Sequence, residues 1–123
     1  MKSNETSQNY LEAIYILSLE KESIKAIDVV NYFGFSRPTV SVALKNLEVN
    51  GFIKIERYCI SLTARGKRVA KDMYERHEYI AKVLMHYGVS KKIAYEDSCL
   101  IEHDLSEESF KAIKKATKNI NIQ

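Results

Sequence analysis

Apolar residues near the N-terminus recur at the spacing of a helix. Tyr10, Ala13, Ile14 and Leu17 stand at positions i, i+3, i+4 and i+7, so one face of the segment is apolar. The helix is expected to begin after Thr6 and Ser7, which are suitable N-caps, and to fade near residue 20. Two polar residues, Asn9 and Glu12, interrupt the otherwise apolar segment.

A short helix, a tight turn and a second helix are predicted between residues 28 and 50. The first helix covers Asp28 to Phe33, and Gly34 stands where a left-handed residue commonly ends a helix. Ser36 is a good N-cap for the second helix, and Pro38 falls in its first turn, where a missing N–H breaks no helical bond. The inner stripe of the second helix is Val40, Ala43, Leu44 and Leu47, and Gly51 ends it.

A small hairpin and three further helices are predicted for the rest of the chain. Residues 52–57 and 59–62 are rich in aromatic and β-branched residues with period-two alternation, which indicates two strands that turn near Tyr58. Three helices are expected to follow, over residues 63–87, 90–104 and 106–119. The fold class is therefore mainly α, with a two-stranded wing after a helix-turn-helix.

This order of elements is typical of a winged helix-turn-helix that binds DNA. A recognition helix needs small or polar side chains on its outer face, because bulky ones would hold it away from the base edges. The predicted DNA contacts from this helix are Ser36, Arg37, Pro38, Thr39, Ser41, Val42 and Lys45, with apolar contacts to thymine methyl groups from Pro38 or Val42. Arg57 and Tyr58 of the wing, and Arg65 after it, are expected to meet the DNA backbone. A winged-helix module for protein interaction, or a plain helical domain, is the alternative.

Composition and charge narrow the class of protein. The chain has 123 residues, 46% of them hydrophobic and 28% charged, which is ordinary for one globular domain or a small domain with a helical addition. The net charge is +3, and the whole excess lies in residues 61–90, where Arg65, Lys67, Arg68 and Lys71 cluster. This cluster favours an anionic partner. Two cysteines are too few for a disulfide scaffold, and no leader-like or membrane-spanning apolar run is visible, so a cytoplasmic protein is expected.

Three potential metal ligands share one face of a predicted helix. Cys99, Glu102 and His103 stand at i, i+3 and i+4, which brings a thiol, a carboxyl group and an imidazole together. His77 falls on the apolar stripe of the preceding long helix, and Glu12 interrupts the first helix. Each has a simpler explanation, because cysteine and histidine also serve as core residues. Several polar residues on buried helical faces nevertheless favour one shared site, since burying each alone would be costly.

Five segments of the sequence resemble the DtxR/MntR family of metal-dependent regulators. They are NYLEAIYIL at 9–17, FSRPTVSVALKNLEVNGFI at 35–53, LTARGKRVA at 62–70, RHEYI at 76–80 and CLIEHDLS at 99–106. The resemblance implies a winged helix-turn-helix DNA-binding domain at residues 1–72 and an all-helical dimerisation and metal-binding domain at residues 73–123. It further implies a homodimeric, metal-activated transcriptional repressor of metal-ion homeostasis genes that binds palindromic operator DNA. The resemblance also implies that the protein is not an enzyme and has no small organic substrate.

The resemblance also assigns metal ligands to this chain. By position, the ligands are Glu12, His77, Cys99, Glu102 and His103. Asn9 stands where the family usually has Asp or Met, so its role as a ligand stays open. Ala81 and Tyr95 stand where iron-type members carry a carboxylate and a histidine of a second site. The family's SH3-like third domain has no counterpart in the sequence.

The donor set leaves the identity of the metal open. A thiolate at Cys99 favours Fe²⁺, Zn²⁺ or Co²⁺ over Mn²⁺, whereas the carboxylate of Glu12 is typical of manganese-type members. Fe²⁺ is preferred here, followed by Mn²⁺ and Zn²⁺. We hypothesise that the cation fixes the spacing of two recognition helices in the dimer. The alternatives are a winged-helix DNA binder with a decayed metal site, and a zinc hydrolase that uses Cys99, His103 and His77 with Glu102 as base.

Overall fold

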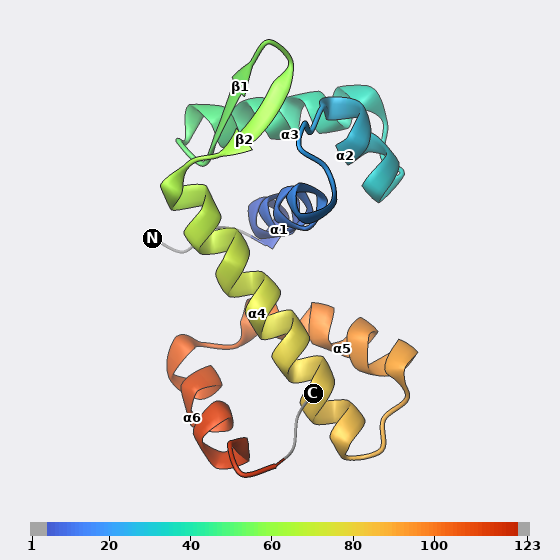
Figure 1. Ribbon diagram of the computed structural model, residues 1–123, viewed down its shortest axis with the longest axis vertical. Coiled ribbons are helices and arrows are strands. Elements are labelled where there is room, and N and C mark those ends of the chain that lie inside the picture. The colour runs from blue at the N-terminus through green and yellow to red at the C-terminus, as the bar shows by residue number, and fades with distance from the viewer. Residues whose placement is uncertain (1–4, 121–123) are drawn as a thin grey trace. The chain divides into compact units, whose positions relative to one another are not determined.

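The computed structural model describes residues 5–120, which form a mainly helical protein with one small antiparallel sheet (Figure 1). The elements are α1 (Glu5–Glu20), α2 (Ala26–Phe33), α3 (Arg37–Val49), β1 (Ile53–Glu56), β2 (Cys59–Leu62), α4 (Ala64–His86), α5 (Lys91–Asp104) and α6 (Glu107–Thr117). This order confirms the fold class predicted from the sequence. The chain divides into two compact units, Met1–Asp72 and Met73–Gln123, which are described separately below.

The turn between α2 and α3 contains the predicted C-cap and N-cap residues. Gly34 adopts a left-handed conformation with φ 74°, and its N–H bonds to the carbonyl oxygen of Val30. The side chain of Ser36 accepts a hydrogen bond from the Thr39 N–H at 3.3 Å, as an N-cap should. However, α2 begins at Ala26, two residues earlier than predicted, because the Asp28 carboxyl group accepts the Lys25 N–H at 2.8 Å.

The wing is an antiparallel hairpin. Strands β1 and β2 pair in register from Ile53 opposite Leu62 to Glu56 opposite Cys59. The connection has two residues, Arg57 and Tyr58, both in the left-handed region with φ 51° and 68°. The predicted turn near Tyr58 is therefore confirmed.

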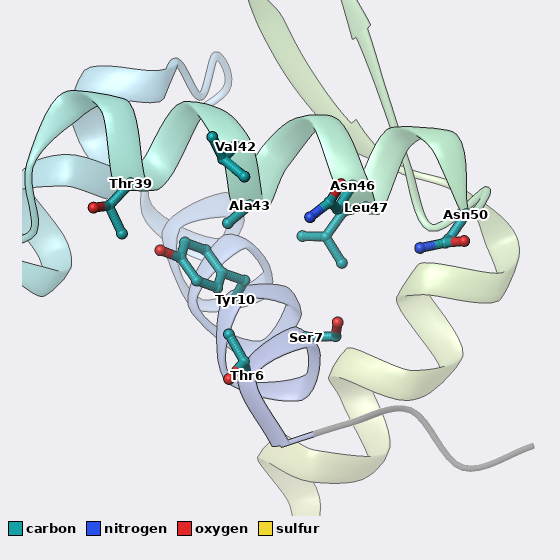
Figure 2. Close-up of a pocket in the computed structure, with 9 residues that line it drawn as sticks. All are labelled: Thr6, Ser7, Tyr10, Thr39, Val42, Ala43, Asn46, Leu47 and Asn50. Carbon is teal, nitrogen blue, oxygen red and sulfur yellow. The ribbon is translucent and has the colours of Figure 1, made fainter.

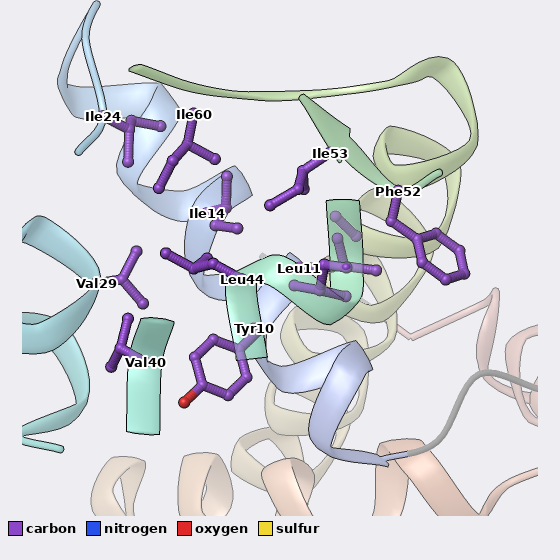
Figure 3. Packing of buried hydrophobic residues seen from close by; sticks show 12 residues of the cluster. Tyr10, Leu11, Ile14, Ile24, Val29, Val40, Leu44, Phe52, Ile53 and Ile60 are labelled. Atoms are coloured by element: carbon purple, nitrogen blue, oxygen red, sulfur yellow. The ribbon is translucent and has the colours of Figure 1, made fainter. Parts of the chain in front are cut away.

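One apolar core holds the first unit together (Figure 3). It combines α1, α2, α3, the hairpin and the start of α4, and its buried members are Tyr10, Leu11, Ile14, Ile24, Val29, Val40, Leu44, Leu47, Phe52, Ile53, Ile60 and Ala70. The α4 helix starts close to the hairpin, since a Cβ on Gly66 would lie 1.9 Å from the Phe52 carbonyl oxygen. The prediction that Thr6 and Ser7 precede α1 is wrong, because the helix already includes Glu5.

The second unit packs α5 and α6 against the C-terminal part of α4 (Figure 1). His77 of α4 contacts Glu102 of α5, and Tyr79 of α4 contacts Phe110 of α6. Ser90 and Ser106 are the N-caps of α5 and α6, as predicted. The last helix ends at Thr117, two residues earlier than expected. Within residues 5–120, no helix is both long and apolar enough to cross a membrane.

Candidate metal centre and nucleic-acid interface

Three of the predicted ligands converge in the second unit. Potential ligand atoms of His77, Cys99 and Glu102 all lie within 4.8 Å of one another. Helix α5 supplies Cys99 and Glu102 through their i, i+3 spacing, and α4 supplies His77. The cluster therefore joins two helices whose ligands are more than twenty residues apart in the sequence.

The carboxyl group of Glu102 is the buried centre of this cluster. Its side chain has no exposed surface, and its Oε2 atom lies 3.0 Å from Nδ1 of His77. Its Oε1 atom lies 3.3 Å from Nε2 of His103, a buried residue outside the group of three. A buried carboxyl group is costly without partners, and here an imidazole stands beside each oxygen.

The geometry and the donor set fit a divalent transition metal. Ligand atoms that bind one tetrahedral ion at about 2.0–2.3 Å stand about 3.3–3.8 Å apart, so side chains whose ligand atoms lie within 4.8 Å of one another need to move closer by no more than about 1.5 Å to bind one ion. Sulfur, nitrogen and oxygen donors together suit ions of intermediate softness. Cys99 is exposed whereas Glu102 is fully buried, so the cluster reaches the protein surface at the thiol.

Two buried polar residues support the cluster, and the sequence-based site did not include them. The Ser98 hydroxyl donates a hydrogen bond to the carbonyl oxygen of His77 at 2.5 Å. The Arg76 guanidinium donates to the carbonyl oxygens of Glu102 and Leu105, and it lies 5.0 Å from the centre of the Phe110 ring. Arg76 precedes His77 and Ser98 precedes Cys99 in the sequence. This adjacency to predicted ligands is the one feature of the sequence that could have identified the two supporting residues.

Tyr95 is also engaged beside the cluster. Its hydroxyl donates a hydrogen bond to Oε2 of Glu78 at 2.8 Å, and its ring centre lies 5.3 Å from that of His77. Burial, followed by the hydrogen bond to Glu78, raises the pKa of Tyr95 to about 12. Ala81 is fully buried and offers no metal donor. The absence of a second iron-type site at these two positions, which the resemblance implies, remains a prediction.

The remaining candidate ligands lie on α1 in the first unit. Glu12 is 7% exposed and Asn9 is half-buried. A separation of three residues places them on the same face of the helix. Their assignment to the metal site remains a prediction.

The outer face of α3 is exposed, as a recognition helix requires. The predicted contacts Ser36, Arg37, Pro38, Thr39, Ser41, Val42 and Lys45 are all exposed. Val42 stands out as an apolar side chain with 62% exposure among polar neighbours. Apolar groups in such positions can contact thymine methyl groups, while hydroxyls can reach phosphates or bases.

A pocket of about 360 Å³ lies beside this face, between α1 and α3 (Figure 2). Helix α3 contributes Thr39, Val42, Ala43, Asn46, Leu47 and Asn50, and α1 contributes Thr6, Ser7 and Tyr10. Most of the polar lining consists of hydroxyl and amide groups, which bind phosphate oxygens in many DNA complexes.

The predicted DNA contacts outside α3 differ in whether they also make contacts within the protein. Arg57 and Tyr58 are exposed at the wing tip. The Nη1 atom of Arg65 donates to the carbonyl oxygen of Asn50 at 2.8 Å, and its guanidinium lies 4.3 Å from the centre of the Phe52 ring. Arg65 therefore ties the start of α4 to the end of α3.

Comparison with known proteins identifies both halves of the chain. Residues 3–59 match the family model of the iron-dependent repressor N-terminal DNA-binding domain. Residues 63–122 match that of the iron-dependent repressor metal-binding and dimerisation domain.

Relatives and solved structures agree with these matches. The transcriptional regulator MntR of Escherichia coli O157:H7 is 34% identical over 115 residues, which cover 93% of this chain and 74% of the relative. The HTH-type transcriptional regulator MntR of Bacillus subtilis is 30% identical over 107 residues, which cover 86% of this chain and 75% of the relative. The structure of the manganese regulator SloR matches with a TM-score of 0.80 and 25% identity, covering 98% of this chain and 56% of SloR.

Proposed function

The chain belongs to the iron-dependent repressor family, and on this basis we propose that it is a metal-dependent, DNA-binding transcriptional repressor of metal-ion homeostasis genes. The observation that most directly supports this proposal is the convergence of His77, Cys99 and Glu102. These residues lie in the part of the chain that matches the metal-binding and dimerisation model. In this role the chain is a regulator and not an enzyme.

The proposed ligands are those predicted from the sequence. We assign His77, Cys99, Glu102 and His103 in the second unit and Glu12 in the first, with Asn9 as a further candidate. A bound divalent cation supplies a link between the helices that carry its ligands, and this link is proposed to fix the distance between the two recognition helices of a homodimer. Glu102 and His103 are buried, so the protein holds these donors in place before an ion arrives.

The first unit reads operator DNA through α3. Its exposed hydroxyl groups and Lys45 suit phosphates and base edges, and Pro38 and Val42 suit thymine methyl groups. Two such helices in a dimer must enter successive major grooves about 34 Å apart, so the operator is palindromic. Arg65 adds a positive charge near the end of α3.

Fe²⁺ is the proposed ion, ahead of Mn²⁺ and Zn²⁺. An exposed thiol among the donors supports this order, since thiolates favour Fe²⁺ or Zn²⁺ over Mn²⁺. Relatives such as SloR are named as manganese regulators, and a carboxylate from Glu12 suits Mn²⁺. A panel of ions is therefore required.

The test measures affinity for a DNA duplex that the chain selects from a random-sequence library, at fixed salt, with and without Fe²⁺, Mn²⁺, Zn²⁺ or Co²⁺. One or more ions should tighten binding, and Glu102→Gln should abolish the stimulation. Glu96→Gln, at an exposed position of the same helix, is the matched control and should respond like the parent. Equal affinity with every ion and with none would favour a metal-independent regulator.

A further inference from the structure

One stripe of α5 contains both its candidate ligands and two residues that contact the ligand on α4. The stripe follows the spacing i, i+3, i+4 and i+7, and its members are Tyr95, Ser98, Cys99 and Glu102. Cys99 and Glu102 belong to the cluster that could hold an ion. Tyr95 and Ser98 are not members of that cluster, yet both contact His77. The same face of α5 therefore supplies ligands and also contacts the ligand of the other helix.

The hydroxyl group of Ser98 fixes the backbone at His77. It donates a hydrogen bond to the His77 carbonyl oxygen at 2.5 Å, and Ser98 has no exposed surface. That carbonyl lies inside α4, where the helical N–H four residues later already satisfies it. Ala94, one turn earlier on α5, is equally buried without a hydroxyl group. The backbone of α4 thus does not require the Ser98 hydroxyl, and its effect is to fix α5 against α4 at the ligand.

Tyr95 restricts the side chain of His77. The centres of the two rings lie 5.3 Å apart, with an angle of 56° between their planes. The Tyr95 hydroxyl donates to Oε2 of Glu78 at 2.8 Å, which holds the tyrosine ring in place. On the imidazole, Nδ1 lies 3.0 Å from Oε2 of Glu102. An aromatic ring and a carboxyl group therefore both contact the imidazole, and together they limit its rotation.

We infer that Tyr95 and Ser98 are positioning residues that hold His77 beside Cys99 and Glu102 before a cation binds, and this inference rests on the proposed function. A side chain that can rotate loses conformational entropy when it binds an ion, whereas one already held in place loses less. Residues that orient metal ligands typically change metal affinity by about 10- to 100-fold when they are substituted. Removing either contact should therefore weaken metal binding although every donor atom is kept.

The first experiment measures Co²⁺ affinity by absorption titration. Tyr95→Phe and Ser98→Ala should each bind Co²⁺ about tenfold more weakly than the parent, while they keep the charge-transfer absorption of the Cys99 thiolate. Tyr79→Phe is the matched control, because the Tyr79 hydroxyl is hydrogen-bonded to Thr117 in the same unit. This control also loses one tyrosine hydrogen bond and should bind Co²⁺ like the parent. Parent-like affinity of either Tyr95→Phe or Ser98→Ala would overturn the inference.

The second experiment tests whether both residues act through His77. The His77→Ala variant lacks this ligand, so adding Tyr95→Phe or Ser98→Ala to it should change Co²⁺ affinity by less than about twofold. The titrations use higher Co²⁺ concentrations to match the weaker binding. A loss of about tenfold that persists in the His77→Ala background would mean that the two residues act independently of His77, against the inference. His77→Ala with the Co²⁺ affinity of the parent would also overturn it.

The third experiment observes His77 by NMR in the protein without metal. The couplings between its Hα and Hβ protons should have the values of one staggered rotamer in the parent, and averaged values in Tyr95→Leu, which removes the ring. The couplings of His86, an exposed histidine of the same helix, should be equal in both proteins. Averaged couplings at His77 in the parent, or unchanged couplings in Tyr95→Leu, would contradict the inference.

The parent titrations distinguish failure of this inference from failure of the proposed function. If the parent binds Co²⁺ and this ion tightens its binding to DNA, unaffected variants refute the positioning role alone. If the parent binds none of Fe²⁺, Mn²⁺, Zn²⁺ and Co²⁺, both the positioning role and the proposed function are wrong.

Discussion

The Oε2 atom of Glu102 lies 3.0 Å from Nδ1 of His77, so the fully buried carboxyl group of α5 is joined to the long helix α4. The other oxygen of the same group faces His103. Removing polar surface from water without compensation is unfavourable. The hydrogen bond with His77 supplies part of that compensation for Oε2, whereas Oε1 has no hydrogen-bond partner among the described residues and a cation would supply one. Glu102 is therefore both a buried residue that joins two helices of the second unit and a proposed metal ligand.

Glu102→Gln should separate these two roles. The amide keeps the shape of the side chain but lacks the negative charge that a cation requires. We expect the free energy of unfolding without metal to change by less than about 1 kcal/mol, whereas an ion at one hundred times its Kd should add about 2.7 kcal/mol to the parent alone. Urea unfolding with and without the ion measures both. Stabilisation of the variant equal to that of the parent would remove Glu102 from the ligand set.

Cys99→Ser should change which metal is preferred. A hydroxyl is a hard, weak donor, so binding of Fe²⁺, Zn²⁺ and Co²⁺ should weaken far more than binding of Mn²⁺. Titrations with each ion measure the selectivity, and Co²⁺ also reports a thiolate bond through its charge-transfer absorption. Cys59→Ser, in the wing, is the control and should keep the parent's selectivity. A uniform loss across all four ions would mean that the thiol does not set the preference.

The features that depend on neighbouring residues are those that could be predicted from the sequence. Gly34 and Ser36 mark their helix ends through local backbone geometry, and the i, i+3 spacing alone brings Cys99 beside Glu102. The contact between His77 and Glu102 depends on how α4 and α5 pack, which no local pattern contains. For that reason the resemblance to a family, and not the spacing, placed His77 at the site.

The residues that support the site were missed for the same reason. Arg76 and Ser98 act on backbone carbonyls more than twenty residues away, and a carbonyl carries no sequence signature. The early start of α2 depends on the side chain of Asp28, which stands inside the helix and accepts a hydrogen bond from the Lys25 N–H that precedes it. The apolar pattern predicted the helices and strands, while the hydrogen-bond partners of Arg76 and Ser98 depend on how the helices pack.

Arg76 is expected to stabilise the second unit. Its guanidinium bonds to the Leu105 carbonyl oxygen at the end of α5 and stacks over Phe110 of α6, so one buried side chain joins three helices. Arg76→Ala should lower the free energy of unfolding by about 2–4 kcal/mol, and Arg76→Lys should recover only part of it because the planar fork is lost. Chemical denaturation measures the effect. Arg68→Ala, at an exposed position of the same helix, should stay within about 0.5 kcal/mol of the parent.

Asp28 gives the first unit a defined dependence on pH. A hydrogen bond from the Lys21 ammonium and one from the Lys25 N–H lower the pKa of this carboxyl group below its ordinary value. Its contribution is therefore complete above the unfolded-state pKa of about 3.9 and disappears as the pH falls through the lowered pKa of the folded state. Asp28→Asn should cost about 0.5–1 kcal/mol at pH 7.

The difference between Asp28→Asn and the parent should shrink as the pH is lowered from 5 toward 2, as measured by urea unfolding at each pH. Glu20→Gln, at the exposed end of α1, serves as the comparison for general charge effects. A difference that stayed constant over this range would mean that the carboxyl group acts through its shape and not through its charge.

Val42 should contribute to DNA reading without contributing to stability. Its side chain is 62% exposed on α3, so Val42→Thr, which keeps the shape and replaces a methyl group by a hydroxyl, should change the free energy of unfolding by less than about 0.5 kcal/mol. If Val42 packs on a thymine methyl group, loss of that contact should weaken binding of the selected duplex about fourfold. Fluorescence anisotropy at fixed salt measures the affinity.

Replacing thymine by deoxyuridine removes the same methyl group from the DNA side. The parent should lose about fourfold in affinity for the uracil duplex, whereas Val42→Thr should bind the two duplexes equally, because a contact already lost cannot be lost again. Val49→Thr, at a more exposed valine at the end of the same helix, should discriminate like the parent. Equal discrimination by Val42→Thr and the parent would assign the thymine methyl contact to another residue, with Pro38 the next to be tested.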